Sequence, residues 1–225
     1  MKKVVVLTGA GISAESGLKT FRDADGLWEG HDVLEVASIE GWYKNKALVL
    51  DFYNQRRRQL FRVEPNAAHY FLKELEKQYE VVIITQNVDD LHERAGSSQV
   101  LHLHGELLKA RSTSHPKLVY TWKKDILSGD LCEEGSQLRP HIVWFGEEVP
   151  MMEIACKYCM SADILIVIGT SMQVYPAASL IQFVQSGTQV YFVDPKPNIS
   201  MGSTDLKIIP KKATEGVEDL RKLLL

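Results

Sequence analysis

Several stretches of this chain are apolar at nearly every position rather than at every second one. The clearest are Val4–Leu7, Val81–Thr85 and Ile164–Gly169; Gln189–Val193 is a fourth and Ile142–Phe145 a shorter candidate. A strand that is covered on both faces needs apolar side chains on both of them. These runs therefore predict interior strands of a parallel sheet.

Helical segments are expected between these strands, at Ala67–Gln78, Met151–Met160, Ala177–Ser186 and Thr214–Leu224. Alternation of strands and helices predicts an α/β fold with a doubly wound, Rossmann-like parallel sheet. Such sheets bind ligands at the carboxyl ends of their strands. Polar residues that directly follow the apolar runs are therefore the first candidates for a site.

Two segments break the alternation. Gly26–Pro65 has a helical pattern and many aromatic residues, whereas Lys109–Arg139 is mixed and polar without a clear core pattern. Neither segment fits the main sheet.

Composition narrows the class of protein. The 225 residues are 45% apolar and 24% charged, which is ordinary for a globular protein. The formal net charge of −3 gives no electrostatic case for binding nucleic acid or an anionic membrane. No apolar stretch reaches the roughly 18 residues of a membrane span. Three cysteines are few and odd in number, which agrees with a reducing, cytoplasmic location.

The N-terminus has two features of a signal peptide, because Lys2 and Lys3 precede a short apolar run. That run is interrupted by Gly9 and Gly11 and continues into a polar segment. Its interpretation as the first core strand is therefore favoured.

The segment after the first strand is rich in glycine. It contains Gly9, Gly11 and Gly17, with Ala14 where the usual dinucleotide fingerprint has its third glycine. A glycine turn between strand and helix lets the backbone approach a pyrophosphate, and free N–H groups at the helix start point to the anion. The alternative is a tight turn that holds no ligand. By itself the spacing indicates a nucleotide phosphate site and no more.

Polar residues also follow other strands. Asn87 and Asp89 stand two apart, so both side chains can face a strand-end cleft, although Asn and Asp are also common in turns. His104 lies at an expected strand end, and a neutral imidazole can accept a proton near neutral pH. His102 would point the same way from a strand and is the competing histidine.

Tyr53 and Arg56 are three residues apart and share a face of the expected helix. A tyrosine hydroxyl and a guanidinium together can bind a carboxylate, the arginine with two hydrogen bonds. The spacing Tyr-x-x-Arg also occurs often by chance in protein sequences. The three consecutive arginines at positions 56–58 could equally form a solvated basic face.

Four separate motifs, in one order, resemble the signatures of the sirtuins, the NAD-dependent protein-lysine deacylases. They are Gly9–Arg22, Thr85–Asp89, Leu103–Gly105, and Gly169–Ser171 with Val174–Ala177. The resemblance runs from about Val4 to the C-terminus.

The resemblance implies one catalytic domain over residues 1–225, with a large nucleotide-binding lobe (about 1–25, 66–108 and 139–225) and a small lobe (about 26–65 and 109–138). It also implies a reaction. The acyl-lysine oxygen attacks the anomeric carbon of NAD and expels nicotinamide. His104 deprotonates the ribose hydroxyls, and the activated hydroxyl attacks the imidate that has formed. The products are free lysine and O-acyl-ADP-ribose.

The resemblance further implies which residues hold NAD. Asn87 and Asp89 would hold the nicotinamide ribose and carboxamide region and act with His104 in catalysis, and Asp194 could reach the adenosine ribose, although Phe192 stands where the family often has Asn. The full set of expected cofactor-binding residues is Gly9, Ala10, Gly11, Ser13, Ala14, Glu15, Thr20, Phe21, Arg22, Trp28, Gln86, Asn87, Asp89, His104, Gly169, Thr170, Ser171, Val193, Asp194 and Ala213.

For the substrate, the resemblance points to the class III branch. In that branch, residues at the positions of Tyr53 and Arg56 would bind the terminal carboxylate of a succinyl or malonyl group on lysine. Desuccinylation with some deacetylation is therefore expected. The substrate peptide would pair as an added strand, through main-chain bonds that accept many sequences. The expected substrate-binding residues are Tyr53, Arg56, Val143, Phe145, Gly146, Glu147, Val174 and Tyr175. Val143 and Phe145 could equally belong to a core strand.

The chain departs from the family at the small-lobe zinc site. Two Cys-x-x-Cys pairs would fall at Ser112 with His115 and at Cys132 with Gly135. His115 and Cys132 are the competent ligands there, and two are too few for a structural zinc site. No zinc is therefore expected.

Packing alone would then hold the small lobe, with Tyr120, Trp122 and Leu131 as candidates. Cys156 and Cys159 also form a Cys-x-x-Cys, but on an expected helix without a partner pair. There they are expected to act as small hydrophobes.

Two alternatives to the deacylase stay open. One is a mono-ADP-ribosyltransferase on the same fold, with the same NAD pocket, although it would need no residues that bind an acyl acid. The other is a non-catalytic NAD or ADP-ribose sensor, against which His104, Asn87 and Asp89 argue. The sequence leaves the protein substrates and the oligomeric state open.

Overall fold

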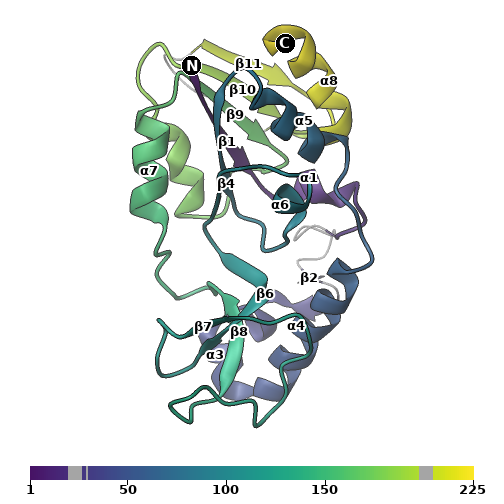
Figure 1. Ribbon diagram of the computed structural model, residues 1–225, viewed down its shortest axis with the longest axis vertical. Coiled ribbons are helices and arrows are strands. Elements are labelled where there is room, and N and C mark those ends of the chain that lie inside the picture. Colours follow the sequence, from purple (N-terminus) through teal and green to yellow (C-terminus); the bar gives the residue numbers. More distant parts are fainter. Residues whose placement is uncertain (20–26, 29, 198–204) are drawn as a thin grey trace.

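The computed structural model describes residues 1–19, 27–28, 30–197 and 205–225. Its larger part contains a six-stranded sheet, seen at the top of Figure 1, in the order β11-β10-β9-β1-β4-β5. All five strand pairs are parallel. The strands are β1 (Lys3–Thr8), β4 (Glu80–Thr85), β5 (Val100–His102), β9 (Ile164–Ile168), β10 (Gln189–Val193) and β11 (Asp205–Ile209). The predicted parallel α/β sheet is confirmed.

Helices cover both faces of this sheet, which explains why its central strands are apolar throughout. Val4 and Val6 of β1 face the core formed with α5 (Ala67–Leu75) and α8 (Ala213–Leu224). The alternate residues of β1 face α7 (Met152–Met160) and the 3₁₀ helix η1 (Ala177–Phe183). Figure 1 shows α7 and α8 on opposite sides of the sheet.

The chain reverses its direction across the sheet between β1 and β9, where the loops that follow these two strands touch. Gly11 donates its N–H to the carbonyl of Gly169 at 2.8 Å. A Cβ on Gly11 would lie 2.7 Å from the Gly169 Cα, so only glycine permits this approach. Ligands of doubly wound sheets bind at this switch point.

A second, smaller part lies at the bottom of Figure 1. Its antiparallel sheet has the order β7-β6-β8, and it packs with α4 (Lys46–Leu60) around a core of its own. The strands of this sheet are β6 (Gly105–Ser112), β7 (Val119–Thr121) and β8 (Leu138–Ile142). The other elements of this part are β2 (Leu27–Trp28), β3 (His31–Asp32), α2 (Val33–Val36) and α3 (Ile39–Lys44). Two short helices, α1 (Ala10–Ala14) and α6 (Leu91–Arg94), follow β1 and β4.

The predicted strand at Ile142–Phe145 is wrong in position. The strand β8 ends at Ile142, and Phe145 forms an isolated bridge to Ser38. The backbone N–H of Phe145 donates to the carbonyl of Ala37 at 2.9 Å. Gly146 then turns the chain with a φ of +87°. Packing against α2 and α3, which no local pattern encodes, sets this path. The expected helices at 67–78 and 177–186 also end earlier, and the second is a 3₁₀ helix.

Three of the four positions at which the resemblance would place zinc ligands, Ser112, His115 and Cys132, are joined by hydrogen bonds. The Ser112 hydroxyl accepts the N–H groups of Ser114 and His115, and the Cys132 thiol lies 3.3 Å from it. The expectation that packing alone holds this part is therefore incomplete. Leu131 is 55% exposed and is not a core residue, so its predicted role is wrong. Tyr120 packs against the core as expected.

Two further features of the described residues bear on function. Among the residues that the structure describes, no helix is long and apolar enough to cross a membrane. Within the same residues, no group of three or more His, Cys, Asp or Glu side chains is placed to hold a metal ion.

Candidate active site

The loop after β4 joins the ends of three neighbouring strands. The backbone N–H of Gln86 bonds the Thr8 carbonyl at the end of β1, at 2.9 Å. Its side-chain amide donates to the Thr170 hydroxyl after β9, at 3.1 Å. Gln86 and Thr170, both predicted cofactor residues, are thus brought together at the switch point of the sheet.

Beside them, Ser13 connects the two polar residues predicted for catalysis. Its hydroxyl donates to Asp89 Oδ2 at 3.0 Å and accepts from Asn87 Nδ2 at 3.1 Å. All three side chains are buried. Burial raises the pKa of Asp89, while hydrogen bonds from the Leu91 N–H and from Ser13 oppose the rise. The amide and carboxylate of this cluster can bind hydroxyl and carboxamide groups.

Two buried histidines that the sequence analysis missed lie beneath this cluster. Nε2 of His69 is 3.5 Å from the Ser13 hydroxyl, and Nε2 of His92 is 3.0 Å from the Thr8 hydroxyl. The rings are 5.0 Å apart. Burial lowers the pKa of His69 to about 4 and that of His92 well below its ordinary value, so both are neutral. His69 is the third residue of its helix, with Asn66 as the N-cap, and that capping pattern was the available signal.

His104 has one ring nitrogen fixed by the backbone. Its Nδ1 lies 3.1 Å from the Gln86 carbonyl oxygen, which can only accept. Nδ1 therefore carries the hydrogen, and Nε2 is left as the proton acceptor. Burial lowers the pKa of His104, although the bond to Gln86 opposes the shift. Gly105, which follows, has a φ of +81°, and a Cβ there would lie 2.0 Å from the His141 carbonyl oxygen.

His102, the competing histidine, is engaged elsewhere. Its Nδ1 lies 3.1 Å from the Asn87 carbonyl oxygen and its Nε2 lies 2.7 Å from Glu93 Oε1. Burial opposes its charged form, but the bond and charge of Glu93 outweigh this and raise the pKa of His102. With both nitrogens directed at acceptors, His102 supports the loop that carries Asn87.

Tyr53 and Arg56 lie on α4 in an aromatic environment. Tyr53 is fully buried, and its hydroxyl accepts from Nε1 of Trp144 at 2.9 Å. The Arg56 guanidinium lies over the Trp28 ring, 4.4 Å from its centre. Burial raises the pKa of Tyr53, and the nearby charge of Arg56 acts against that rise. The predicted pair is thus brought together, with Trp28 beside it.

The segment predicted to bind peptide is tied to His104 and to a charged cluster. The Val143 N–H donates to the His104 carbonyl at 2.9 Å. Glu147 accepts from Arg139, from Arg111 and from the N–H of Trp144, so its carboxylate is used within the protein. Phe145 is 40% exposed.

The remaining predicted residues fall into three groups. Val193, Asp194 and Gly169 meet at the ends of β10 and β9, where the Gly169 N–H donates to Val193. Glu15 bonds the N–H and hydroxyl of Thr214, which fixes the start of α8 at Ala213. The third group follows β1 or β9 and consists of Gly9, Ala10, Ala14, Ser171, Val174 and Tyr175, the last of which is 70% exposed. The predicted residues Thr20, Phe21 and Arg22 are outside the residues that the structure describes.

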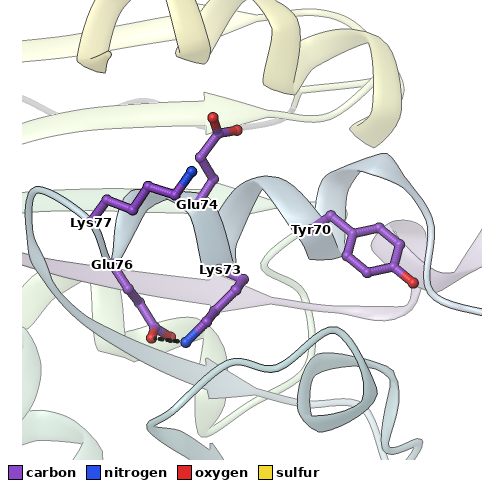
Figure 2. Close-up of a pocket in the computed structure, with 5 residues that line it drawn as sticks. All are labelled: Tyr70, Lys73, Glu74, Glu76 and Lys77. Atoms are coloured by element: carbon purple, nitrogen blue, oxygen red, sulfur yellow. Dashed lines mark hydrogen bonds and ion pairs between the residues drawn. The ribbon is translucent and has the colours of Figure 1, made fainter.

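A hollow on the outer surface of α5 is separate from this cluster of residues. Figure 2 shows the five side chains that line it, with Lys73 and Glu76 joined by an ion pair of 2.7 Å. Ser98 donates its hydroxyl and its N–H to Glu76 and completes that network. None of these residues carries a predicted role.

Comparisons with known proteins agree with the site. A model of the Sir2 family matches residues 9–176. An "NAD-dependent protein deacylase" of Helicobacter pylori is 60% identical over 225 residues, which cover 100% of this chain and 98% of the relative. One from Bacteroides thetaiotaomicron is 52% identical over 231 residues, 100% of this chain and 99% of the relative.

Solved structures agree as well. A Sir2 homologue in complex with NAD has a TM-score of 0.87 at 40% identity and covers 100% of this chain and 91% of its own. A Sir2 protein bound to an acetylated peptide has a TM-score of 0.82 at 29% identity, over 98% and 92% of the two chains.

Proposed function

Since this chain belongs to the Sir2 family and is an NAD-dependent protein deacylase, we propose that it prefers lysines that carry a dicarboxylic acyl group, succinyl above all. Malonyl and acetyl groups would be removed as well. The products would be nicotinamide, O-acyl-ADP-ribose and free lysine. The class III assignment, without structural zinc, belongs to the same proposal.

The observation that carries the preference is the pairing of a buried hydroxyl with a cation. Tyr53 is fully buried and its pKa is raised, so its hydroxyl stays neutral and able to donate. Arg56 is near enough for its charge to act on that hydroxyl. A neutral donor and a guanidinium suit a carboxylate, whereas an acetyl group offers no charge to this pair.

The described residues at the switch point fit NAD by the chemistry of their donors. Asn87 and Asp89 offer an amide and a carboxylate held by Ser13, which suit the carboxamide and hydroxyls of a nicotinamide riboside. Gln86 and Thr170 lie next to them. NAD would supply the bond to nicotinamide that is broken in the reaction.

His104 is proposed as the base. Its Nδ1–H is bound by Gln86, which leaves Nε2 unprotonated to accept a proton from a ribose hydroxyl. The lowered pKa keeps the imidazole neutral at pH 7. The hydrogen bond from Val143 to the His104 carbonyl links this base to the segment proposed to receive the peptide as an added strand. A cytoplasmic location stays a prediction.

A mass-spectrometric assay tests the proposal, with and without NAD, on one peptide that carries either succinyl-lysine or acetyl-lysine. We expect faster NAD-dependent loss of succinyl, abolished by His104→Ala. Arg56→Met should lower succinyl turnover about tenfold or more and spare acetyl turnover, because it removes a charge-assisted hydrogen bond. Arg58→Met is the matched control, since Arg58 is half-exposed and pairs with Asp125 at 2.7 Å.

Two outcomes would overturn the proposal. Acetyl turnover well above succinyl turnover would mean that Tyr53 and Arg56 do not bind an acid. NAD consumption without loss of either acyl group would favour ADP-ribosyl transfer.

A further inference from the structure

The direction of one hydrogen bond fixes what the Tyr53 hydroxyl can do. Among the described residues, Trp144 is its single hydrogen-bond partner, with 2.9 Å between Nε1 and Oη. An indole N–H can only donate. The Tyr53 oxygen is therefore the acceptor in this bond, and the hydroxyl hydrogen is not used in it.

The surroundings of Tyr53 make that hydrogen valuable to a ligand. The side chain is fully buried, and its ring neighbours are Trp28, Phe52 and Trp144, with centres at 5.1 to 6.3 Å. Aromatic rings accept hydrogen bonds poorly, and a buried donor without an acceptor costs free energy. A carboxylate that entered beside Arg56 would accept the hydrogen of the Tyr53 hydroxyl and would lie next to the positive charge of the guanidinium.

Trp144 is held so that its indole N–H cannot turn away from Tyr53. The Arg139 guanidinium lies 3.3 Å from the centre of the indole ring. The backbone N–H of Trp144 donates to Glu147 Oε2 at 2.9 Å, and Arg139 bonds the same carboxylate. The ring of Trp42, with its centre 5.6 Å away, also packs against it. Rotation of the indole would break the stacking with Arg139.

From this geometry we propose that Trp144 is a specificity-determining positioning residue. By donating its indole N–H to Tyr53, it directs the Tyr53 hydroxyl hydrogen to the terminal carboxylate of the acyl group. The inference rests on the acid-binding role proposed above for Tyr53 and Arg56. It adds that a side chain which does not touch the acyl group sets the preference for that group.

The same segment connects acyl recognition with the base. Val143 bonds the His104 carbonyl through its N–H, and the next residue, Trp144, bonds Tyr53. Two adjacent residues therefore hold His104 and Tyr53 in one fixed arrangement.

Trp144→Phe tests the inference, because phenylalanine keeps an aromatic ring and removes the N–H. The readout is the ratio of kcat/KM for a succinyl-lysine peptide to that for the matching acetyl-lysine peptide. We expect Trp144→Phe to lower this ratio about three- to tenfold, mainly through KM of the succinyl peptide, as for the loss of a hydrogen bond. Tyr53→Phe should lower it at least as much, and the double variant should be no worse than Tyr53→Phe.

Trp42→Phe is the matched control. It alters the packing around Trp144 without touching the hydrogen bond, so the ratio should stay within twofold of the wild-type ratio. An equal loss in Trp42→Phe and Trp144→Phe would assign the effect to packing and overturn the inference.

A measurement that leaves Trp144 in place covers the case in which Trp144→Phe does not fold. With ¹⁵N-tryptophan, the four indole N–H groups give four resonances. One of them should move in Tyr53→Phe and also on addition of the succinyl peptide, but much less with the acetyl peptide. If none of the four indole resonances shifts in Tyr53→Phe, the inference is overturned.

The kinetic outcomes separate the two proposals. A wild-type enzyme that prefers acetyl-lysine would overturn both of them. A succinyl preference that Arg56→Met removes, but Trp144→Phe leaves intact, would overturn the role of Trp144 alone.

Discussion

The carbonyl oxygen of Gln86 lies 3.1 Å from Nδ1 of His104, and this contact decides which ring nitrogen can act as a base. Because a carbonyl can only accept, the hydrogen is on Nδ1, and Nε2 carries the lone pair. A residue of the cofactor motif thus sets the protonation pattern of the histidine 18 positions further along the chain.

The first prediction concerns the pH dependence of deacylation. His104 must be neutral to accept a proton, and its folded pKa lies below the ordinary value of 6.5. Activity should therefore fall as pH drops through a midpoint below 6.5. A kcat/KM profile measures this. The His102→Gln variant should show the same loss of activity at low pH. A midpoint above 6.5 would contradict the role of His104 as the base.

The second prediction concerns Ser13→Ala. The change removes the donor to Asp89 and the acceptor for Asn87, so both side chains lose their fixed positions. We expect NAD affinity to fall about tenfold, as for the loss of a buried hydrogen bond to a carboxylate. Calorimetric titration with NAD measures it. Ser16→Ala, which affects only a bond to Asn66, serves as the control.

The third prediction concerns stability at low pH. His69 is fully buried, with a folded pKa of about 4 against 6.5 in the unfolded chain. Above pH 6.5 it is neutral in both states. Below 6.5 the unfolded chain takes up the proton first, so stability is lost as pH falls from 6.5 towards 4.

The loss from His69 should reach about 3 kcal/mol. Urea unfolding at several pH values measures it. His69→Gln should show a shallower decline, because glutamine does not titrate and can keep the capping bond to Asn66. Equal slopes in the two proteins would assign the acid sensitivity to other groups.

The fourth prediction concerns metal removal. Ser112 accepts two backbone N–H groups at the place where sirtuins carry zinc ligands. A strong chelator should therefore leave the melting temperature unchanged. Ser112→Ala should lower the free energy of unfolding by about 1–2 kcal/mol, and Ser114→Ala, at an exposed position, by much less. A chelator that unfolds the protein would show that a metal holds this part.

The fifth prediction concerns the contact between the two glycine loops. A Cβ on Gly11 would clash with the Gly169 backbone at 2.7 Å, so Gly11→Ala should cost more than about 3 kcal/mol of stability. At Gly187 a Cβ meets nothing within 4 Å, and Gly187→Ala should cost only the roughly 1 kcal/mol of its positive φ. Thermal unfolding compares the two. A smaller loss at Gly11 than at Gly187 would mean that the loops separate easily.

The sequence by itself determined the main sheet and much of the site. The continuous apolar runs of β1, β4, β9 and β10 are read correctly because each strand is buried on both faces, which local composition records. Polar residues that follow such strands, Gln86 and Asn87 among them, meet at one edge because parallel strands end together.

Only the tertiary structure decided the contacts between distant segments. β5 has only three residues and β11 is mostly exposed, so neither leaves a continuous apolar run in the sequence. His69 and Trp144 carry no local signal of their partners, since the bonds to Ser13 and Tyr53 span 56 and 91 positions. Burial pattern is a local property of the chain, whereas the direction of a hydrogen bond between remote side chains depends on how the packed elements are placed.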